Sequence, residues 1–137
     1  MFGNGQTKWP VQRVRSKRAN TTVNADIYMA HGINEYSGRT ATAASVHLRN
    51  GFRVIGIDMP SFGRSSGLHG YLPTLRWNEG ALNAVMLHVH MWDEYEQLEN
   101  LANRKRFAQG ASMGGFTCAY QAALRPPPST SVSMSLN

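Results

Sequence analysis

The hexapeptide Gly110-Ala111-Ser112-Met113-Gly114-Gly115 constrains the fold of this chain more than any other stretch. Its pattern, G-x-S-x-G, is typical of a strand that turns sharply into a helix and holds a serine in a strained, exposed conformation. Small residues are needed at Gly110 and Gly114 because the turn brings backbone against backbone, so that a Cβ at either position would clash. We therefore predict that Ser112 is a nucleophile. A glycine-rich loop that caps a helix at Ser112 is the simpler alternative, since so short a pattern also occurs by chance.

The rest of the chain is predicted to alternate between strands and helices. Apolar and β-branched runs predict strands at 24–30, 52–57 and 104–109. Apolar faces predict helices at 40–49, at about 75–101 and at 113–124. The strand at 104–109 is a poor one, because only Phe107 and Ala108 in it are apolar. This alternation indicates an α/β fold, a parallel sheet with flanking helices.

The formal net charge of +6 is concentrated in the first 20 residues, which carry five basic residues and no acidic one. The remaining nine basic and eight acidic residues nearly balance. The basicity therefore belongs to an N-terminal arm (1–20), which precedes a partial domain (21–126) and an unstructured, Ser/Thr-rich tail (127–137). We favour a solvated arm over one that binds nucleic acid or a membrane surface, and an organelle transit peptide stays open.

Cysteine content and hydropathy limit the class of protein further. A single cysteine, Cys118, excludes an internal disulfide and a cysteine-clustered metal site. No run approaches the roughly 18 apolar residues of a membrane-spanning helix. Metalloprotease, P-loop and dinucleotide-binding motifs are absent from the sequence. We therefore expect no cofactor, no metal and a cytoplasmic location.

Three loops together resemble the α/β-hydrolase family, specifically the N-terminal half of its monoacylglycerol lipase and lysophospholipase-like (serine aminopeptidase-like) branch. Residues 31–39, HGINEYSGR, look like the branch's HG-x-x-E-x-S-G-R loop. Residues 56–67, GIDMPSFGRSSG, look like its D-x-x-G-x-G-x-S-x-G loop, with Ser61 where the family usually has a glycine. Residues 110–115 look like its G-x-S-M-G-G motif. The resemblance covers roughly Asp26 to Pro126.

The resemblance implies a serine hydrolase that cleaves carboxylic esters, such as monoacylglycerols or lysophospholipids, through an acyl-Ser112 intermediate. The backbone N–H groups of Met113 and Ile33 would form the oxyanion hole. The remaining motif residues would shape the loops: Gly110, Gly114, Gly115, His31, Gly32 and Asp58. Of these, we expect His31 to be structural and not the catalytic base, and Asp58 to bond backbone and not to be the triad acid. The implied partner is a small lipid-like ester and no specific nucleic acid; peripheral membrane contact and oligomeric state stay open.

The proton acceptor that the family places after the serine is missing. In α/β-hydrolases the triad runs serine, acid, histidine along the chain, yet residues 113–137 contain no Asp, Glu or His. We expect the upstream His69, His88 and His90 to be surface or packing residues, and Cys118 to be a core residue. The chain is therefore expected to be truncated and impaired. The alternative function is a non-catalytic interaction fragment that binds a protein partner or an acidic surface through an exposed sheet edge and the basic arm.

Overall fold

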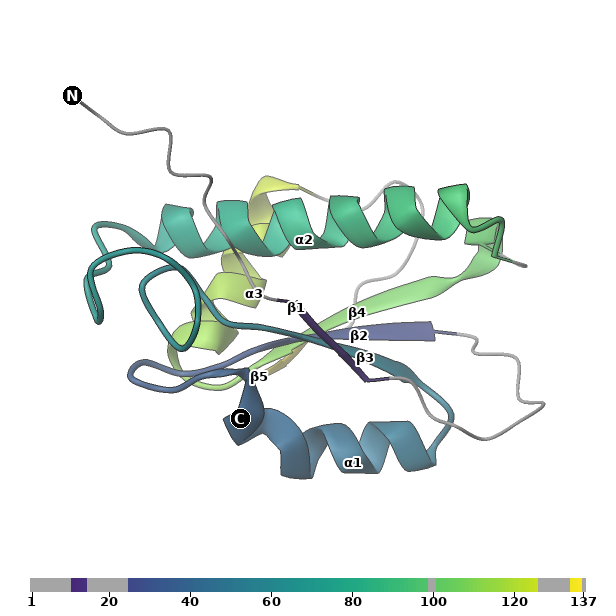
Figure 1. Ribbon diagram of the computed structural model, residues 1–137, viewed down its shortest axis with the longest axis horizontal. Helices are drawn as coiled ribbons and strands as arrows, with labels where there is room; N and C mark the ends of the chain where they lie inside the picture. Colours follow the sequence, from purple (N-terminus) through teal and green to yellow (C-terminus); the bar gives the residue numbers. More distant parts are fainter. Residues whose placement is uncertain (1–10, 15–24, 99–100, 126–133, 137) are drawn as a thin grey trace.

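A five-stranded sheet with helices on both faces is formed by residues 11–14, 25–98, 101–125 and 134–136, the part of the chain that a computed structural model describes (Figure 1). The strands are β1 (Val11–Val14), β2 (Ala25–Ala30), β3 (Arg53–Ile57), β4 (Lys105–Gly110) and β5 (Met134–Leu136). The α-helices are α1 (Ala41–Arg49), α2 (Leu75–Tyr95) and α3 (Met113–Leu124), and two short 3-10 helices are η1 (Ser37–Thr40) and η2 (Leu101–Asn103).

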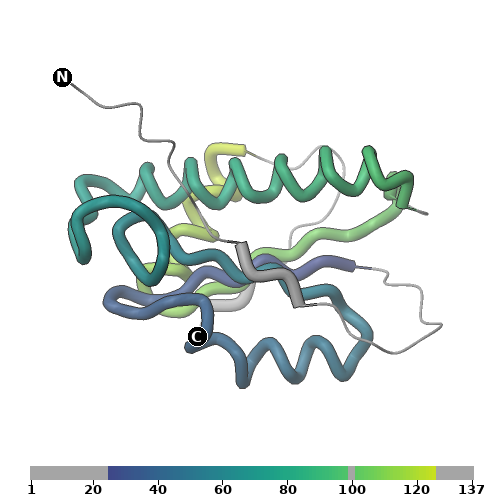
Figure 2. Tube along the Cα trace, viewed as in Figure 1, coloured from purple at the N-terminus to yellow at the C-terminus, as the bar shows by residue number. Residues whose placement is uncertain are grey.

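The strand order is β1-β3-β2-β4-β5, and all neighbouring strands are parallel except β1 with β3. Helices α2 and α3 cover one face of the sheet and α1 covers the other (Figure 1 and Figure 2). Ala30 at the end of β2 is in register with Ile57 of β3 and Gly110 of β4. The loops that follow these strands therefore leave the same edge, at the left of Figure 1. The predicted α/β fold is confirmed.

The side chains of β2 alternate between two hydrophobic cores, one on each face of the sheet. Tyr28 and Ala30 belong to the core under α2 and α3, whereas Ile27 and Met29 pack with Ala44 of α1. All six residues of β2 are buried, as expected for a parallel strand with helices on both sides. This burial makes β2 the fixed element against which the loops of the candidate site are placed.

Partners on both helical layers hold the polar strand β4 inside the sheet, between β2 and β5. His47 of α1 donates through Nε2 to Gln109 Oε1 at 2.6 Å, and Arg106 donates to Nδ1 of His90 on α2. A polar side chain at a covered position is tolerated when it finds a hydrogen-bond partner. The strand that the sequence predicts only weakly is therefore formed.

Four buried charged side chains form an ionic cluster at the amino edge of the sheet, away from these loops. Arg53 donates to both carboxylate oxygens of Asp26, at 2.8 and 2.6 Å, and also binds the carboxylate of Asp93 on α2. Arg104 Nε donates to Asp26 Oδ1 at 2.9 Å. Burial of Arg53 opposes its charge, but hydrogen bonds with Asp93 and Asp26 hold its pKa above its usual value. The ionic cluster ties α2 to β2, β3 and the segment before β4.

Two strands lie where the sequence predicted no regular structure. β1 lies in the arm and β5 in the tail, and each pairs along one side only, with β3 and β4 respectively. Pairing with an existing strand provides backbone hydrogen bonds that local sequence preference does not reveal. The remainder of the arm and of the tail lies outside the described residues, so the division of the chain at 20 and 126 stays a prediction.

Helix α2 ends at Tyr95, well before the predicted end at Leu101. The N–H of Gln97 donates to Glu94 O at 3.1 Å, and the N–H of Leu98 donates to Asp93 O at 3.0 Å. Gln97 has a φ of 52°. This is the Schellman arrangement, whose left-handed position is usually a glycine. The predicted boundary was wrong because a glutamine gives no signal of a helix end.

Candidate active site

Ser112 lies where β4 turns into α3, at the carboxyl edge of the sheet. Its backbone has φ 51° and ψ −118°, a conformation that costs a residue other than glycine about 1–3 kcal/mol. Ser112 is exposed, while Met113 and Gly115 in the first turn of α3 are buried. Because Met113 is the first residue of α3, its N–H has no acceptor one turn earlier in the helix. A strained serine thus stands beside an N–H group suited to bind an anion.

The glycines around Ser112 allow three backbone segments to touch. A Cβ on Gly110 would lie 2.2 Å from the carbonyl carbon of Gly114, and a Cβ on Gly114 would lie 2.1 Å from the carbonyl oxygen of Ala30. Neither position can hold a side chain unless the backbone moves. A Cβ on Gly32 would lie 3.5 Å from the carbonyl oxygen of Ala111. The end of β2 and the loop after it therefore lie directly against the turn that carries Ser112.

The loop after β2 is closed by Glu35. The N–H of Glu35 donates to Gly32 O at 3.3 Å, and its Oε2 accepts the N–H of Gly32 at 2.8 Å. Asn34 completes this tight turn with a φ of 57°. Ile33 lies at the tip and is exposed. Its two neighbours are bonded to each other's turn, so the orientation of the peptide between Gly32 and Ile33 is set by these contacts.

His31 is completely buried and joins the loop after β2 to the loop after β3. The N–H of Met59 donates to its Nε2 at 2.9 Å, so Nε2 carries no proton. Nδ1 is then the protonated nitrogen, and it lies 2.7 Å from the carbonyl oxygen of Gly32. Both ring nitrogens are engaged in backbone contacts. In this state the imidazole has no free lone pair with which to accept a proton from a serine.

Asp58 binds backbone N–H groups from both loops. Its Oδ1 accepts the N–H of Ser37 at 2.7 Å and its Oδ2 accepts the N–H of Arg64 at 2.9 Å. Burial of Asp58 opposes ionisation, but the hydrogen bonds from Arg64 and Ser37 outweigh it and hold the pKa of this carboxyl below its usual value. The carboxylate is therefore an anchor that keeps the two loops together.

Ser61, the residue that stands in place of the family's glycine, has a φ of 68°. Its N–H donates to Ser66 O at 3.0 Å and its carbonyl accepts the N–H of Gly70 at 2.9 Å, so its backbone cannot relax. The side chain is buried, and no partner for its Oγ lies within reach among residues 25–98 and the other described segments. The position thus requires the conformation that glycine adopts freely.

The other candidate side chains have structural surroundings. His90 accepts from Arg106 and lies 3.2 Å from Glu94, His88 is exposed, and the ring of His69 contacts Phe62. Cys118 is in the core, as predicted, and its burial raises the pKa of the thiol to about 11. Within the described ranges no three His, Cys, Asp or Glu side chains gather as metal ligands, and no helix is both long and apolar enough to cross a membrane.

Solved structures of α/β hydrolases share this architecture over most of the chain. The monoacylglycerol lipase of Paleococcus ferrophilus matches with a TM-score of 0.71 and 22% identity, over 94% of this chain and 43% of that one. A soluble variant of the Saccharomyces cerevisiae monoglyceride lipase matches with a TM-score of 0.72 and 16% identity, over 88% and 37%. Mouse α/β hydrolase domain-containing protein 10 matches with a TM-score of 0.65 and 15% identity, over 99% and 47%. The chain spans less than half the length of each.

The fold is that of a partial α/β hydrolase: a mostly parallel sheet covered by helices, with its loops gathered at one edge. The model of the family of S33 serine aminopeptidases matches residues 21–135, and the chain belongs to this family. The family resemblance seen in the three loops is thereby confirmed. No curated protein matches the sequence closely enough to be counted as a relative.

Two contacts that shape the site were not anticipated from the sequence. Glu35 falls inside the quoted loop motif, but no role was assigned to it, although its carboxylate binds Gly32 N–H. The left-handed conformation of Ser61 was expected only as an altered turn. In both cases the available signal was a motif position, and the contact itself depends on how the chain folds back.

Proposed function

We propose that this chain is the nucleophile-bearing part of a serine hydrolase that cleaves carboxylic esters of the monoacylglycerol or lysophospholipid class. The observation that carries the proposal is the backbone of Ser112, a strained and exposed serine held between β4 and α3. Strain at a non-glycine residue persists where function requires it. Membership of a hydrolase family and monoacylglycerol lipases among the similar structures support the choice of substrate class.

The oxyanion formed during ester cleavage would be bound by the N–H groups of Met113 and Ile33. The N–H of Met113 belongs to the open first turn of α3. Ile33 follows Gly32, whose Cβ position lies 3.5 Å from Ala111 O, beside the serine. A donor of this kind contributes about 2.7–4 kcal/mol in the transition state. Glu35 would support the hole indirectly, since it orients the peptide between Gly32 and Ile33.

The reaction needs a base that accepts the proton of Ser112. Oγ attacks the carbonyl carbon, the proton passes to the base and then to the departing alcohol, and water later releases the acid from the acyl-serine. Residues 113–137 contain no Asp, Glu or His, and His31 has both ring nitrogens engaged. We therefore place the acid and the base outside these 137 residues, and expect the chain alone to be impaired.

A fluorophosphonate probe tests the nucleophile directly, because its phosphorus is attacked by Ser112 Oγ and loses fluoride. We expect slow labelling of the folded chain that is abolished by Ser112→Ala and unchanged by Ser66→Ala, a control at an exposed serine. Ile33→Ala keeps the backbone donor and should label like the parent, whereas Ile33→Pro removes it and should label more slowly. Circular dichroism would establish that each variant is folded.

The second candidate function is a non-catalytic fragment that binds a partner. It is favoured by one observation, the lack of any acid or base after Ser112. Folded protein that resists the probe, with Ser112→Ala indistinguishable from the parent, would support this function and contradict the first.

A further inference from the structure

Large apolar side chains surround the Ser112 turn and are left exposed to solvent. They come from the loop after β2, the loop after β3 and the first turns of α2 and α3, and each is between 38% and 74% exposed. This apolar rim consists of Ile33, Tyr36, Leu68, Tyr71, Leu75 and Phe116. A contiguous group of exposed apolar side chains on one end of a domain marks a surface that binds something.

The loops that carry the apolar rim are in contact with one another. A Cβ on Gly70 would lie 4.0 Å from Asn34 Oδ1, which places the loop after β3 beside the loop after β2. The N–H of Tyr71 donates to Leu68 O at 2.9 Å and closes a turn with an apolar side chain at each end. A short turn with Leu and Tyr exposed at its ends suits insertion between lipid head groups, where Tyr is favoured.

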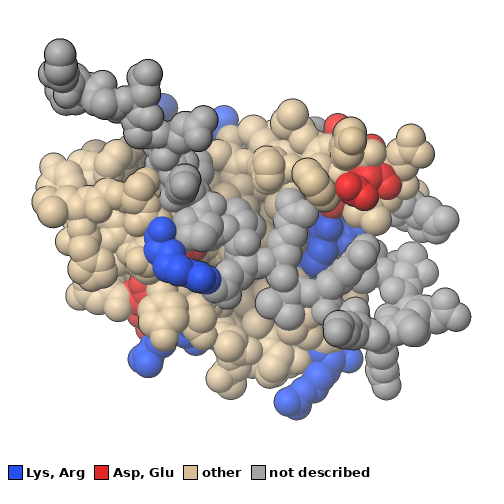
Figure 3. All heavy atoms as spheres, in the orientation of Figure 1, with Lys and Arg blue, Asp and Glu red and all other residues tan. Residues whose placement is uncertain are grey.

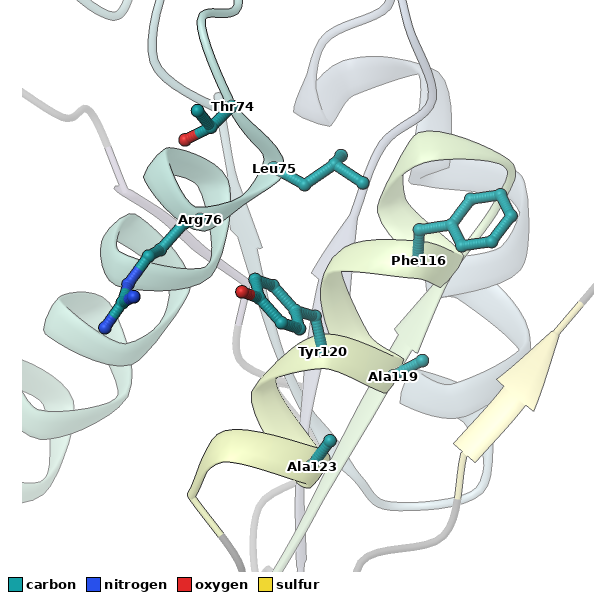
Figure 4. A pocket seen from close by; sticks show the side chains of 7 residues that line it. All are labelled: Thr74, Leu75, Arg76, Phe116, Ala119, Tyr120 and Ala123. Atoms are coloured by element: carbon teal, nitrogen blue, oxygen red, sulfur yellow. The ribbon is translucent and has the colours of Figure 1, made fainter.

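A groove between α2 and α3 continues the apolar rim along the helices. It has a volume of about 650 Å³ and is lined by Thr74, Leu75, Arg76, Phe116, Ala119, Tyr120 and Ala123. Figure 4 shows Leu75 reaching from α2 toward α3, and Tyr120 reaching from α3 toward Arg76. Since Phe116 follows Ser112 by one helical turn, the groove begins next to the serine.

The charges on these segments have one sign wherever they are exposed. Within residues 31–40, 58–77 and 111–118, the exposed charged side chains are Arg39, Arg64 and Arg76. The carboxylates of Glu35 and Asp58 are partly or fully buried and accept backbone N–H groups. Acidic side chains gather instead at the other end of the molecule, over the end of α2 (Figure 3), where Glu94 and Glu96 are exposed.

We propose that the apolar rim and its three arginines form a surface that docks on an anionic lipid–water interface. The arginines are attracted to negative head groups, and the rim side chains enter the head-group layer. This orientation turns Ser112 toward the lipid, so that an ester in the layer meets the serine without passing through water. The proposal deepens the proposed function, because it names the physical state in which the ester is presented.

Vesicle binding of the full-length Ser112→Ala chain tests this surface without relying on catalysis. Phosphatidylcholine vesicles with and without phosphatidylglycerol would be co-sedimented with the protein. We expect binding only when phosphatidylglycerol is present, weakened by salt. Arg64→Gln should lower the partition coefficient about five-fold, the usual effect of one basic residue near such a surface. Arg49→Gln, at the exposed end of α1, is the matched control and should have no effect.

The apolar contribution has its own matched pair. Leu68→Ser combined with Tyr71→Ser should reduce binding further than Arg64→Gln, whereas Leu87→Ser combined with Met91→Ser should not, although Leu87 and Met91 on α2 are 54% and 66% exposed. Equal effects of the two pairs would overturn the proposal, as would binding through the basic arm alone, in which neither pair has an effect. Absence of binding to any vesicle would overturn it as well and favour a protein partner at the rim.

The two proposals fail separately. Vesicle binding by a chain that the fluorophosphonate probe does not label would leave the docking surface standing and remove the proposed activity. Labelling at Ser112 without vesicle binding would do the reverse.

Discussion

Replacing Ser61 by glycine should make the domain more stable. Ser61 has a left-handed backbone with a φ of 68° that is pinned by hydrogen bonds to Ser66 and Gly70. Its buried Oγ has no hydrogen-bond partner among the described residues. Ser61→Gly removes both the backbone strain and the unsatisfied hydroxyl.

The size of the effect follows from three opposing contributions. The left-handed conformation costs a residue other than glycine roughly 1–2 kcal/mol, and a buried hydroxyl without a partner costs about 1–3 kcal/mol. Glycine returns roughly 0.5–1 kcal/mol by making the unfolded chain more flexible, and the small void it leaves lowers the gain further. We therefore expect the free energy of unfolding to rise by about 1–2 kcal/mol.

Urea unfolding followed by circular dichroism measures this change. At a typical slope of about 2 kcal/mol/M, the midpoint should rise by about 0.5–1 M with the slope unchanged. Ser61→Ala separates the two contributions, because it removes the hydroxyl and keeps the strained backbone, so it should be less stable than Ser61→Gly. A glycine variant no more stable than the alanine variant would refute the role assigned to the backbone.

Three further outcomes are expected. Arg53→Met should destabilise the domain by about 3–5 kcal/mol, because it leaves the buried carboxylate of Asp93 without its arginine and that of Asp26 with Arg104 alone; an effect below 1 kcal/mol in urea unfolding would contradict this. Gln97→Gly should stabilise by about 0.5–1 kcal/mol relative to Gln97→Ala, since Gln97 occupies the left-handed position that ends α2; equal midpoints would refute it. Asp58→Asn should flatten the loss of thermal stability in acid: the pKa of Asp58 is lowered on folding, so its contribution is present above the unfolded pKa of about 3.9 and is lost as pH falls through the lower folded value. Parallel melting-temperature profiles of the parent and the Asn variant would show the carboxylate to be unimportant.

Much of the fold could be predicted because its pattern is local. The apolar strands at 25–30 and 53–57, and the helices at 41–49 and 113–124, lie within a residue or so of their expected positions. The strands β1 and β5 could not be predicted, since their backbone partners are distant in sequence. The ionic cluster also escaped notice, because Asp26 and Arg53 look like polar interruptions of apolar strands until β2 and β3 are paired.

The candidate site was predictable to the extent that its geometry is encoded by glycine. A motif of small residues indicated the tight turn at Ser112, and the contacts of Gly110 and Gly114 show why side chains are excluded there. The motif contains no information about which groups complete the site, so the roles of Ser112, Met113 and Ile33 stay predictions. The contact between Glu35 and Gly32 depends on a loop conformation that the order of residues does not reveal.

The ionic cluster also has a consequence for how the strands find their alignment. Asp26 and Arg53 are direct neighbours across β2 and β3, and successive side chains of a strand point to opposite faces. A slip of one residue would send one of the two charges to the far side of the sheet and leave the other stranded in an apolar interior. Misaligned sheets are thereby penalised at the end of the molecule where no chemistry occurs, and the loops at the other end inherit their alignment from it.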